Sequence, residues 1–449
     1  MDILTLNCGS SSVKYMLYRW DKKEIVSEGV VQRVGIPGSF IEHYAAGKGE
    51  FKVERECTVH TEAIQLIIDT LLDSEKGVIS DLTSIKGVGH RMVHGGEVFA
   101  KSAIIDDEFI ETFKKLSSLA PLHNPPNLMG VEAAKKLIPD APHCAIMDTA
   151  WHQTMPEHVY MYALPYQWYK KYGVRRYGFH GSSLLYCSKR ASVLLGKDPF
   201  ETNVIILHIG NGASANAVKN GISYDTSMGL TPLEGLVMGT RAGDHDAGID
   251  LFMMRNENMN VDELDKALNK NSGLLGVTEK YSDRRDIELA AEDGDERCKL
   301  AIELEAYRLK KYVGAYAAAL GRIDAIIFTA GVGEKGAIIR KKTLEGLENI
   351  GIIIDSEKNM HSKTRQAETD ITGVNSKVKV FVIPTDEEIV FVEDTVALIE
   401  GRYDVHTNFK YSFQSKDYRN PARDEALIEE LKYKPAIADI IAKIPEEIV

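Results

Sequence analysis

Several arginine and histidine side chains of this sequence stand among glycine, proline and asparagine residues. These segments are residues 89–96 (GHRMVHGG), 121–127 (PLHNPPN), 177–183 (YGFHGSS) and 238–244 (MGTRAGD). Such compositions favour loops, and loops on a rigid scaffold are where binding and catalytic groups are usually mounted. A guanidinium pairs with carboxylate or phosphate oxygens in a fork, and an imidazole can donate hydrogen bonds to them. A single histidine of this kind is more simply a core residue, but four such segments favour a shared site.

Two glycine turns indicate a phosphate-binding site. Residues 7–12 (NCGSSS) follow a β-rich run that begins at Ile3, and residues 208–214 (HIGNGAS) follow a similar run that begins at Val204. Glycine lets backbone N–H groups approach an anion without a Cβ in the way. Either turn alone is more simply the end of a strand. The pair, in matched context, predicts a duplicated fold that grips one polyphosphate between its halves.

A third glycine cluster leaves an alternative open. Residues 331–336 (GVGEKG) follow the apolar run 325–330 and fit the pattern G-x-G-x-x-G, and Asp355 follows an expected strand at 352–354. This arrangement is typical of dinucleotide-binding enzymes. It leaves the two earlier turns unexplained, so we expect the cluster to be a loop near the adenosine or α-phosphate end of ATP. No G-x-x-x-x-G-K-[ST] is present, which excludes a P-loop.

Carboxylates that follow buried strands are the candidate metal ligands. Asp148 comes directly after the apolar run 144–147, and Glu387 and Glu388 follow the run 380–384. Mg²⁺ is usually held by one or two carboxylates together with phosphate oxygens. His90 and His94 have the spacing of a zinc helix, but the glycines around them disfavour a helix there.

The elements that must position these groups alternate between strand and helix. Residues 2–7, 12–19 and 25–34 predict a three-strand meander, and residues 203–209, 213–218 and 221–226 repeat it with a tight turn at 219–221. Helical periodicity is present at 61–73, 107–118, 128–138, 182–195, 261–269 and 297–320. The sequence therefore predicts an α/β protein with an internal repeat.

Composition narrows the class of protein. The 449 residues favour two domains, and 44% hydrophobic and 27% charged residues are ordinary for a globular chain. The net charge of −12 argues against nucleic-acid and membrane partners and favours small molecules. The five scattered cysteines form no C-x-x-C, and the N-terminus enters a strand without a leader pattern, so we expect a cytoplasmic protein.

At the motif level the chain resembles the acetate kinase family from residue 3 to about residue 400. The motifs that carry the resemblance are residues 7–12, 89–91, 94–96, 147–150, 178–181, 208–212, 225–229, 235–241, 331–334 and 384–388. The family belongs to the superfamily of acetate and sugar kinases, Hsp70 and actin. The resemblance implies duplicated actin-like (ribonuclease H-like) domains that face each other across a nucleotide cleft. It also implies homodimers and reversible transfer of the γ-phosphoryl group of ATP to acetate, with Mg²⁺, or Mn²⁺ in its place.

The resemblance assigns roles to particular residues. Arg91 and Arg241 would hold the acetate carboxylate and the phosphoryl group in transfer, and His180 would donate a hydrogen bond to phosphoryl oxygens. His123 and His208 would line the same track, and Asn7, Asp148 and Glu387 would place the metal directly or through water. The pocket for the methyl group would comprise Val93, Leu122, Phe179 and Pro232. The nucleotide residues would be Lys14, His208, Gly210, Asn211, Gly212, Asp283, Arg285, Gly331, Gly333 and Glu334.

The chain also departs from the family pattern. Arg284 stands where an aromatic residue is usual, His245 and Ala247 replace the common Ile and Pro, and Asp386 replaces a usual Asn. The expected domains are residues 1–150 with 388–405, and residues 151–387. Residues 406–449 form an extension that we expect to pack on the body as a helical pair.

Alternatives to an acetate kinase remain at this stage. A propionate kinase would have the same fold, and a non-catalytic switch of the actin or Hsp70 type would not need Arg91, His180 and Arg241. An NAD-dependent enzyme would rest on residues 331–355 alone.

Overall fold

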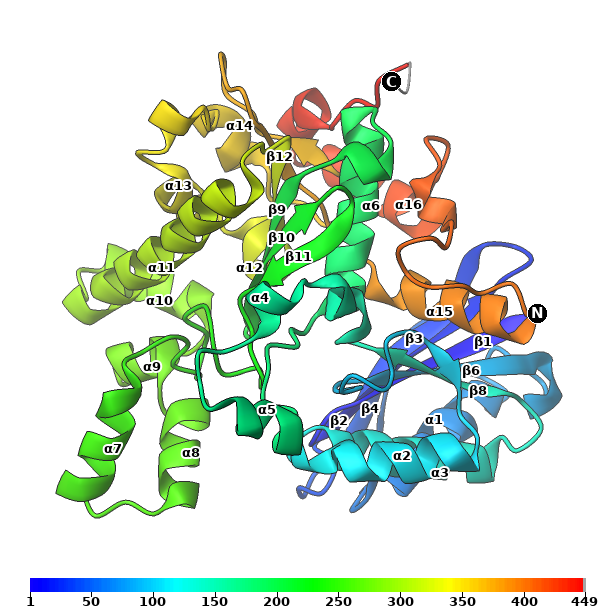
Figure 1. Cartoon of the computed structure of the whole chain (residues 1–449). Helices are drawn as coiled ribbons and strands as arrows, with labels where there is room; N and C mark the ends of the chain where they lie inside the picture. Colours follow the sequence, from blue (N-terminus) through cyan, green and yellow to red (C-terminus); the bar gives the residue numbers. More distant parts are fainter. Residues whose placement is uncertain (447–449) are drawn as a thin grey trace. The chain divides into compact units, whose positions relative to one another are not determined.

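The chain folds into two compact units, each made of two segments (Figure 1). The computed structural model describes residues 1–446. Unit 1 comprises Met1–Gln153 and Asp386–Tyr411, and unit 2 comprises Thr154–Thr385 and residues 412–446. The predicted extension 406–449 is therefore divided between the units, and its last three residues lie outside the described part.

Unit 1 is built on an eight-stranded sheet. Its strands are β1 (Asp2–Cys8), β2 (Ser12–Arg19), β3 (Glu24–Gln32), β4 (Phe40–Ala45), β5 (Gly49–Glu54), β6 (Ile85–Met92), β7 (Ala103–Ile104) and β8 (His143–Met147). Their order in the sheet is β5-β4-β3-β2-β1-β6-β8-β7. β1 to β5 form an antiparallel meander, whereas β6 is parallel to β1 and β8 is parallel to β6.

Helices contribute the rest of the unit 1 core. They are α1 (His60–Leu72), α2 (Asp107–Lys115), α3 (Asn124–Leu137) and α15 (Glu387–Ile399). α1 and α3 bury Ile64, Leu71 and Ala134 with the strand residues Leu4 and Val88 in one cluster. Residues 121–127 were predicted as a loop, but α3 already begins at Asn124 because Pro125 and Pro126 are tolerated in a first helical turn.

The predicted loop 89–96 is also partly wrong. Residues 89–92 are the end of strand β6, and the glycines have a packing role. A Cβ on Gly89 would lie 2.6 Å from Thr395 Oγ1 and 3.3 Å from Phe391 O, both on α15. Glycine is therefore needed here for the close approach of a helix to the strand.

Unit 2 repeats the central strand order. Its strands are β9 (Val204–Ile209), β10 (Ala213–Lys219), β11 (Ile222–Thr226), β12 (Ala325–Thr329), β13 (Thr369–Asp370) and β14 (Lys379–Val382). The order β11-β10-β9-β12-β14 has the same antiparallel and parallel pairings as β3-β2-β1-β6-β8. Asn220 and Gly221, with φ of 50° and 72°, form the predicted turn between β10 and β11. The duplication predicted from the two meanders is confirmed.

The helices of unit 2 include the longest of the chain. They are α4 (Glu157–Tyr160), α5 (Tyr166–Tyr172), α6 (Gly181–Leu195), α7 (Ala247–Asn256), α8 (Val261–Lys270), α9 (Gly273–Thr278), α10 (Arg284–Glu292), α11 (Glu296–Leu320), α12 (Ala330–Lys335), α13 (Ala337–Leu344), α14 (Ser356–His361) and α16 (Pro421–Leu431). α11 begins where Asp295 accepts a hydrogen bond from the Cys298 N–H at 2.9 Å, and ends before Gly321 at φ 73°. Short 3₁₀ segments occur in both units: η1 (Leu82–Ser84), η2 (Leu116–Ser118), η3 (Ala150–Thr154), η4 (Pro199–Glu201), η5 (Glu348–Ile350), η6 (Ser412–Gln414) and η7 (Pro435–Ile440).

The third glycine cluster differs from its prediction. Gly331 and Gly333 lie in helix α12 and not in a loop. Residues 352–354 form no strand beyond a single bridge at Ile354. Asp355 caps α14 by accepting hydrogen bonds from Glu357 N and Lys358 N, both at 3.0 Å. The Asp355 carboxylate is engaged as a helix cap. The acidic residue that a dinucleotide site would need after a second strand is therefore not provided by Asp355.

Candidate active site

Arg91 and Asp148 form the charged centre of the unit 1 site. Arg91 lies near the end of β6, and Asp148 directly follows the neighbouring parallel strand β8. Arg91 donates from Nε to Asp148 Oδ1 at 2.9 Å and from Nη2 to Oδ2 at 2.8 Å. Burial opposes the charge of Arg91, but the carboxylates of Asp148 and Glu387 raise its pKa above the ordinary value. The fork uses Nε and Nη2, which leaves Nη1 outside this pair.

An acidic group stands at the start of α15. Asp386 caps this helix by accepting a hydrogen bond from Ile389 N at 3.3 Å, a role that Asn fills equally well. Burial raises the pKa of Glu387, and burial with the charges of Glu387 and Asp386 raises the pKa of Glu388 to about 7. Lys14 acts against both shifts, since its positive charge lowers the two pKa values. The cluster therefore has an excess of negative charge that a cation would neutralise.

Asn7 and Lys14 come from the first hairpin of unit 1. They are directly paired residues on β1 and β2. In the described part of the chain, no three His, Cys, Asp or Glu side chains are grouped to hold a metal by themselves. An amide oxygen from Asn7 and carboxylates from α15 still fit Mg²⁺, which commonly completes its shell with water and phosphate oxygens. Asp148 does not fit as simply, because both of its oxygens are taken by Arg91.

His180 and His208 form a stacked pair in unit 2. Their ring centroids are 4.2 Å apart and their planes differ by 16°. His180, at φ 58°, precedes helix α6, and its Nδ1 lies 3.0 Å from Ser214 Oγ. His208 lies on β9, and its Nδ1 lies 2.8 Å from Ser183 Oγ. The two serine hydroxyls therefore orient the two imidazoles.

The second glycine turn and Arg241 meet at this imidazole pair. Gly210 donates its N–H to Gly212 O at 3.2 Å, which closes the turn. A Cβ on Gly212 would lie 3.5 Å from Arg241 Nη1 and 3.6 Å from His180 Nε2. The glycine turn, the Arg241 guanidinium and the His180 imidazole thus lie next to one another. Asn211 is held there through its carbonyl, which accepts from Gly239 N at 3.0 Å.

Arg241 differs from Arg91 in its partners. Its Nη1 donates to Pro232 O at 3.2 Å and lies 3.8 Å from Met238 Sδ, and within residues 1–446 no carboxylate forms an ion pair with it. Burial lowers the pKa of this guanidinium. A half-buried arginine without a counter-charge is suited to an anionic substrate that supplies one.

Two predicted nucleotide residues pair with each other. Asp283 caps α10 by accepting from Arg285 N at 2.8 Å, and its carboxylate also pairs with Arg285 Nη2 at 3.1 Å. Arg284, the departure from the family's aromatic residue, turns inward to Glu305 and to Glu288, whose Oε1 lies 3.2 Å from Arg284 Nε. Arg284 is thus buried with ion pairs to two glutamates, whereas Asp283 and Arg285 lie at the surface.

Glu334 is held from two sides in α12. Its Oε1 accepts from Thr385 N at 3.3 Å, and its Oε2 pairs with Arg365 Nε at 3.0 Å. Burial raises the pKa of Glu334, while Arg365 and the hydrogen bond from Thr385 act in the opposite direction. Gly331 lies against Arg365, since a Cβ there would be 3.0 Å from its Nη2.

The four predicted pocket residues come from different units. Phe179 is buried next to His180, and Pro232 provides the carbonyl that accepts from Arg241, both in unit 2. Val93 donates its N–H to Asn127 Oδ1 at 2.9 Å in unit 1, where Leu122 is exposed and His123 occupies the N-cap position of α3.

Three polar residues of this site were not predicted as site residues. Ser183 and Ser214 orient the imidazoles, and Thr385 contacts both Ser183 and Glu334. A signal for the serines was present, because each lies within a few residues of a glycine-flanked histidine or glycine turn. No local pattern pairs Thr385 with Ser183, which stands 202 residues earlier in the chain.

The duplicated sheets, with a glycine turn at the first hairpin of each, define the actin-like class of nucleotide-dependent proteins that includes the acetate and sugar kinases. The sequence profile of the Acetokinase family matches residues 2–393, and the chain belongs to this family. Membership of this family overturns the alternative of an NAD-dependent enzyme.

Individual relatives agree with the family assignment. The acetate kinase of Geobacter metallireducens is 59% identical over 418 residues, which cover 93% of this chain and 99% of the relative. That of Treponema pallidum is 55% identical over 442 residues, which cover 98% of this chain and 99% of the relative.

Solved structures agree as well. The crystal structure of Porphyromonas gingivalis acetate kinase has a TM-score of 0.84 at 46% identity and covers 89% of this chain and 99% of its own. A propionate kinase from Francisella tularensis has a TM-score of 0.82 at 38% identity and covers 88% of this chain and 99% of its own.

Proposed function

We propose that this protein transfers the γ-phosphoryl group of ATP to acetate, forming acetyl phosphate and ADP in a reversible reaction. The observation that carries the proposal is that Arg241 and His180 lie beside the Gly210–Gly212 turn. No carboxylate of the described residues neutralises the Arg241 guanidinium there. Family membership supports the same reaction.

The chemistry explains why cationic groups dominate the site. An acetate carboxylate is already ionised at neutral pH, so it needs no general base before it attacks phosphorus. The barrier lies in bringing two anions together and in the charge that spreads over the transferred phosphoryl group. Arg241 supplies positive charge, and His180 supplies a hydrogen bond whose direction is set by Ser214 at 3.0 Å.

Arg91 has a complementary role in this proposal. Its fork to Asp148 holds the guanidinium plane, and Nη1 remains to bind an oxygen of the acceptor carboxylate or of the phosphoryl group. Asp148 is then a positioning residue for Arg91, while His123 lines the path of the substrate. Val93, Leu122, Phe179 and Pro232 would receive the methyl group.

The nucleotide and its metal have candidate ligands among the remaining residues. Gly210, Asn211 and Gly212 would approach the phosphates with backbone N–H groups, with Lys14 and His208 as further contacts. Asp283, Arg285, Gly331, Gly333 and Glu334 would contact the nucleoside end. Asn7 and Glu387 would hold Mg²⁺, or Mn²⁺ in its place, and the bound cation would neutralise phosphate charge.

Propionate is the second candidate acceptor. The similarity to a propionate kinase structure favours it as an alternative substrate. One additional methylene in an apolar pocket changes selectivity by only about 1–3 kcal/mol, so we expect propionate to be a poorer substrate that still turns over.

A hydroxylamine trap for acyl phosphate tests the proposal. The protein is incubated with ATP, Mg²⁺ and acetate, propionate or butyrate, and the hydroxamate is measured. We expect acetate to give the highest kcat/KM and butyrate the lowest. Absence of hydroxamate with all three acids would rule out an acid kinase.

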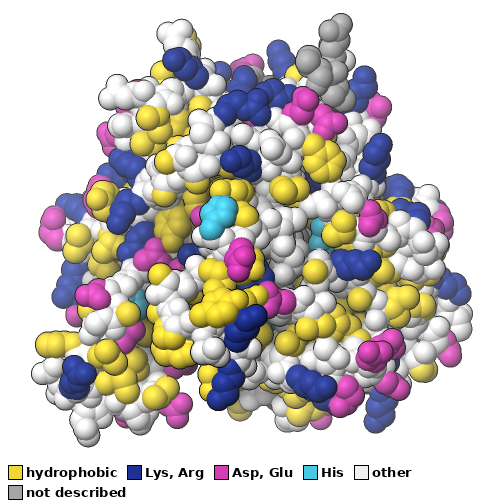
Figure 2. All heavy atoms as spheres, in the orientation of Figure 1, with side chains coloured by type: hydrophobic (Ala, Val, Ile, Leu, Met, Phe, Trp, Pro, Cys, Tyr) yellow, Lys and Arg dark blue, Asp and Glu magenta, His cyan; other side chains and the backbone are white. Residues whose placement is uncertain are grey.

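A homodimer in the cytoplasm completes the proposal. Hydrophobic side chains are exposed on α7 and α5, among them Ile249, Phe252 and Trp168, and Figure 2 shows such side chains at the surface over these helices. Such exposure is suited to contact with a second copy. All five cysteines are buried and unpaired, which fits a reducing compartment, and no helix of residues 1–446 is long and apolar enough to cross a membrane.

A further inference from the structure

The C-terminal segment, residues 412–446, lies outside the family profile, yet it is part of unit 2. Phe413, Ile437 and Ile440 are buried, Ile441 forms a bridge with Thr369, and Ala442 N donates to Glu368 O at 2.9 Å. Arg190 of α6 forms a fork with Glu368 at 2.7 Å for both bonds and also donates to Phe413 O at 2.8 Å. The segment is therefore attached by apolar and charged contacts.

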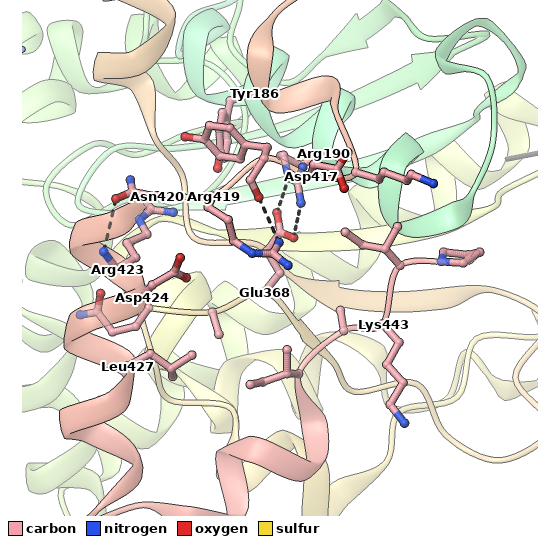
Figure 3. A pocket seen from close by; sticks show the side chains of 18 of the residues that line it. Tyr186, Arg190, Glu368, Asp417, Arg419, Asn420, Arg423, Asp424, Leu427 and Lys443 are labelled. Atoms are coloured by element: carbon pink, nitrogen blue, oxygen red, sulfur yellow. Dashed lines mark hydrogen bonds and ion pairs between the residues drawn. The ribbon is translucent and has the colours of Figure 1, made fainter. Parts of the chain in front are cut away.

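A pocket of about 710 Å³ lies where this segment meets α6 and the residues before β13 (Figure 3). Its lining includes two arginines from the segment with different partners. Arg419 is exposed and donates to Tyr418 O at 3.1 Å, the carbonyl of its own neighbour. Arg423 is half-buried and donates to two residues far away in the sequence.

Arg423 binds the backbone of the chain just before it leaves unit 2. Its Nη1 donates to Pro384 O at 3.1 Å, and its Nη2 donates to Thr385 O at 2.7 Å. Arg423 itself is fixed at the start of α16, where Asn420 Oδ1 accepts from its N–H at 3.3 Å (Figure 3). Thr385 is the last residue of this part of unit 2, and Asp386 begins the second segment of unit 1.

All three polar groups of Thr385 form hydrogen bonds. Its carbonyl accepts from Arg423, its N–H donates to Glu334 Oε1 at 3.3 Å, and its hydroxyl donates to Ser183 Oγ at 2.8 Å. Ser183 Oγ in turn lies 2.8 Å from His208 Nδ1. A chain of hydrogen bonds thus leads from a residue outside the family profile to the imidazole pair of the site.

We propose that Arg423 is a positioning residue that, by binding the Pro384 and Thr385 carbonyls, holds the Thr385–Ser183–His208 hydrogen-bond chain and thereby the orientation of the His208 and His180 imidazoles. The catalytic part of this inference rests on the proposed function. The structural part, from Arg423 to the His208 ring, does not depend on it.

The direction of these bonds has a chemical consequence. Because Ser183 accepts from Thr385, its own hydrogen is available to His208 Nδ1. His208 is then an acceptor at Nδ1 and carries its proton at Nε2. Without Arg423, the carbonyls that it binds lose a charged donor, Thr385 gains freedom, and this preference for one tautomer weakens.

Nitrogen NMR of histidine-labelled full-length protein tests the structural part without any substrate. The variants are Arg423→Ala and Arg423→Lys, with Arg419→Ala as the matched control on the same segment. We expect Arg423→Ala to move the chemical shifts of the two His208 ring nitrogens towards the average for the two tautomers. Arg423→Lys should reverse part of this change, and Arg419→Ala should give the chemical shifts of the unmodified protein. Unchanged His208 signals in Arg423→Ala would overturn the proposal.

Kinetics test the catalytic part. We expect Arg423→Ala to lower kcat about tenfold, the effect of about 1.4 kcal/mol in the barrier, with little change in KM for acetate. A changed NMR signal with unchanged kcat would overturn the link to catalysis alone. A protein that makes no acyl phosphate would contradict the proposed function and would leave the NMR result to decide the positioning role.

Thr385→Val provides a second route if Arg423→Ala does not fold. The change keeps the side-chain shape and removes only the hydroxyl that donates to Ser183. We expect the same shift at His208 and, in the double variant with Arg423→Lys, less than the sum of the two effects on kcat. An unchanged His208 signal in Thr385→Val, or fully additive effects, would overturn the hydrogen-bond chain.

Discussion

Arg91 and Asp148 form a two-point ion pair across adjacent parallel strands, with both carboxylate oxygens engaged at 2.9 and 2.8 Å. The Asp148 side chain is only 2% exposed, whereas that of Arg91 is 19% exposed. The carboxylate is thus buried behind the guanidinium, and the open side of the pair is cationic. This asymmetry makes Asp148 a support for Arg91.

Removing the charge of Asp148 tests this support. We expect Asp148→Asn to destabilise the fold by about 3–5 kcal/mol, the usual cost of breaking a buried pair, and to lower acyl phosphate formation by at least about tenfold. Urea unfolding and the hydroxamate assay measure the two effects. Glu429→Gln removes an exposed pair with Lys432 and is the control, for which we expect little change in either. Parent-like stability of Asp148→Asn would contradict the buried pair.

Arg241 is expected to behave differently from Arg91. Since no carboxylate of the described residues pairs with it, Arg241→Ala should change the melting temperature of the unmodified protein by only a few degrees. This corresponds to about 1 kcal/mol in the free energy of unfolding. We expect kcat to fall by about 10²–10³, the range found when one transition-state donor is removed. Arg255→Ala on the exposed face of α7 is the control. Full activity of Arg241→Ala would contradict its role.

The metal assignment predicts a shift in magnesium dependence. We expect Asn7→Ala and Glu387→Gln to raise the Mg²⁺ concentration for half-maximal activity by about tenfold or more, because each removes an oxygen donor or its charge. Activity is titrated with MgCl₂ at constant ATP. Glu400→Gln, just beyond the end of α15, is the control. Identical Mg²⁺ curves for all variants would exclude both ligands.

A buried histidine pair predicts acid sensitivity of the fold. His90 Nε2 lies 2.9 Å from His143 Nδ1, and burial lowers the pKa of both imidazoles, with Lys135 acting in the same direction. The unfolded chain therefore binds more protons than the folded chain below about pH 6.5, and stability is lost as the pH falls through that range.

Denaturant unfolding between pH 7.5 and 5 measures this loss. We expect the parent to lose stability steadily over this range and His90→Gln to show a smaller slope with pH. His361→Gln at the surface of α14 is expected to keep the parental slope. Equal slopes for parent and His90→Gln would contradict the assignment.

The C-terminal segment is expected to stabilise unit 2. Phe413 is fully buried against Tyr186 of α6, with ring centroids 4.8 Å apart. We expect Phe413→Ala to cost about 3–5 kcal/mol, and Tyr433→Ala, which alters a side chain that is 84% exposed, to have almost no effect. Calorimetry of the full chain compares the two. Equal melting temperatures would contradict the packing.

Short-range patterns determined much of the fold. The 297–320 helix, the repeated meander and the Asn220-Gly221 turn were all predicted, because periodicity, capping and turn chemistry act over a few residues. The family motifs also determined which residues are candidates for the site.

Tertiary structure decided how those residues are used. Gly89 was predicted in a loop and lies in a strand, because its lack of a side chain admits α15, which is remote in sequence. Arg284 turns inward because Glu305 of α11 is there to receive it. Thr385 joins Arg423 to Ser183 across 38 and 202 residues of sequence. The sequence by itself determined the local elements and the chemical inventory, whereas strand order and helix packing decided which charges meet, since such contacts depend on distances that no local pattern encodes.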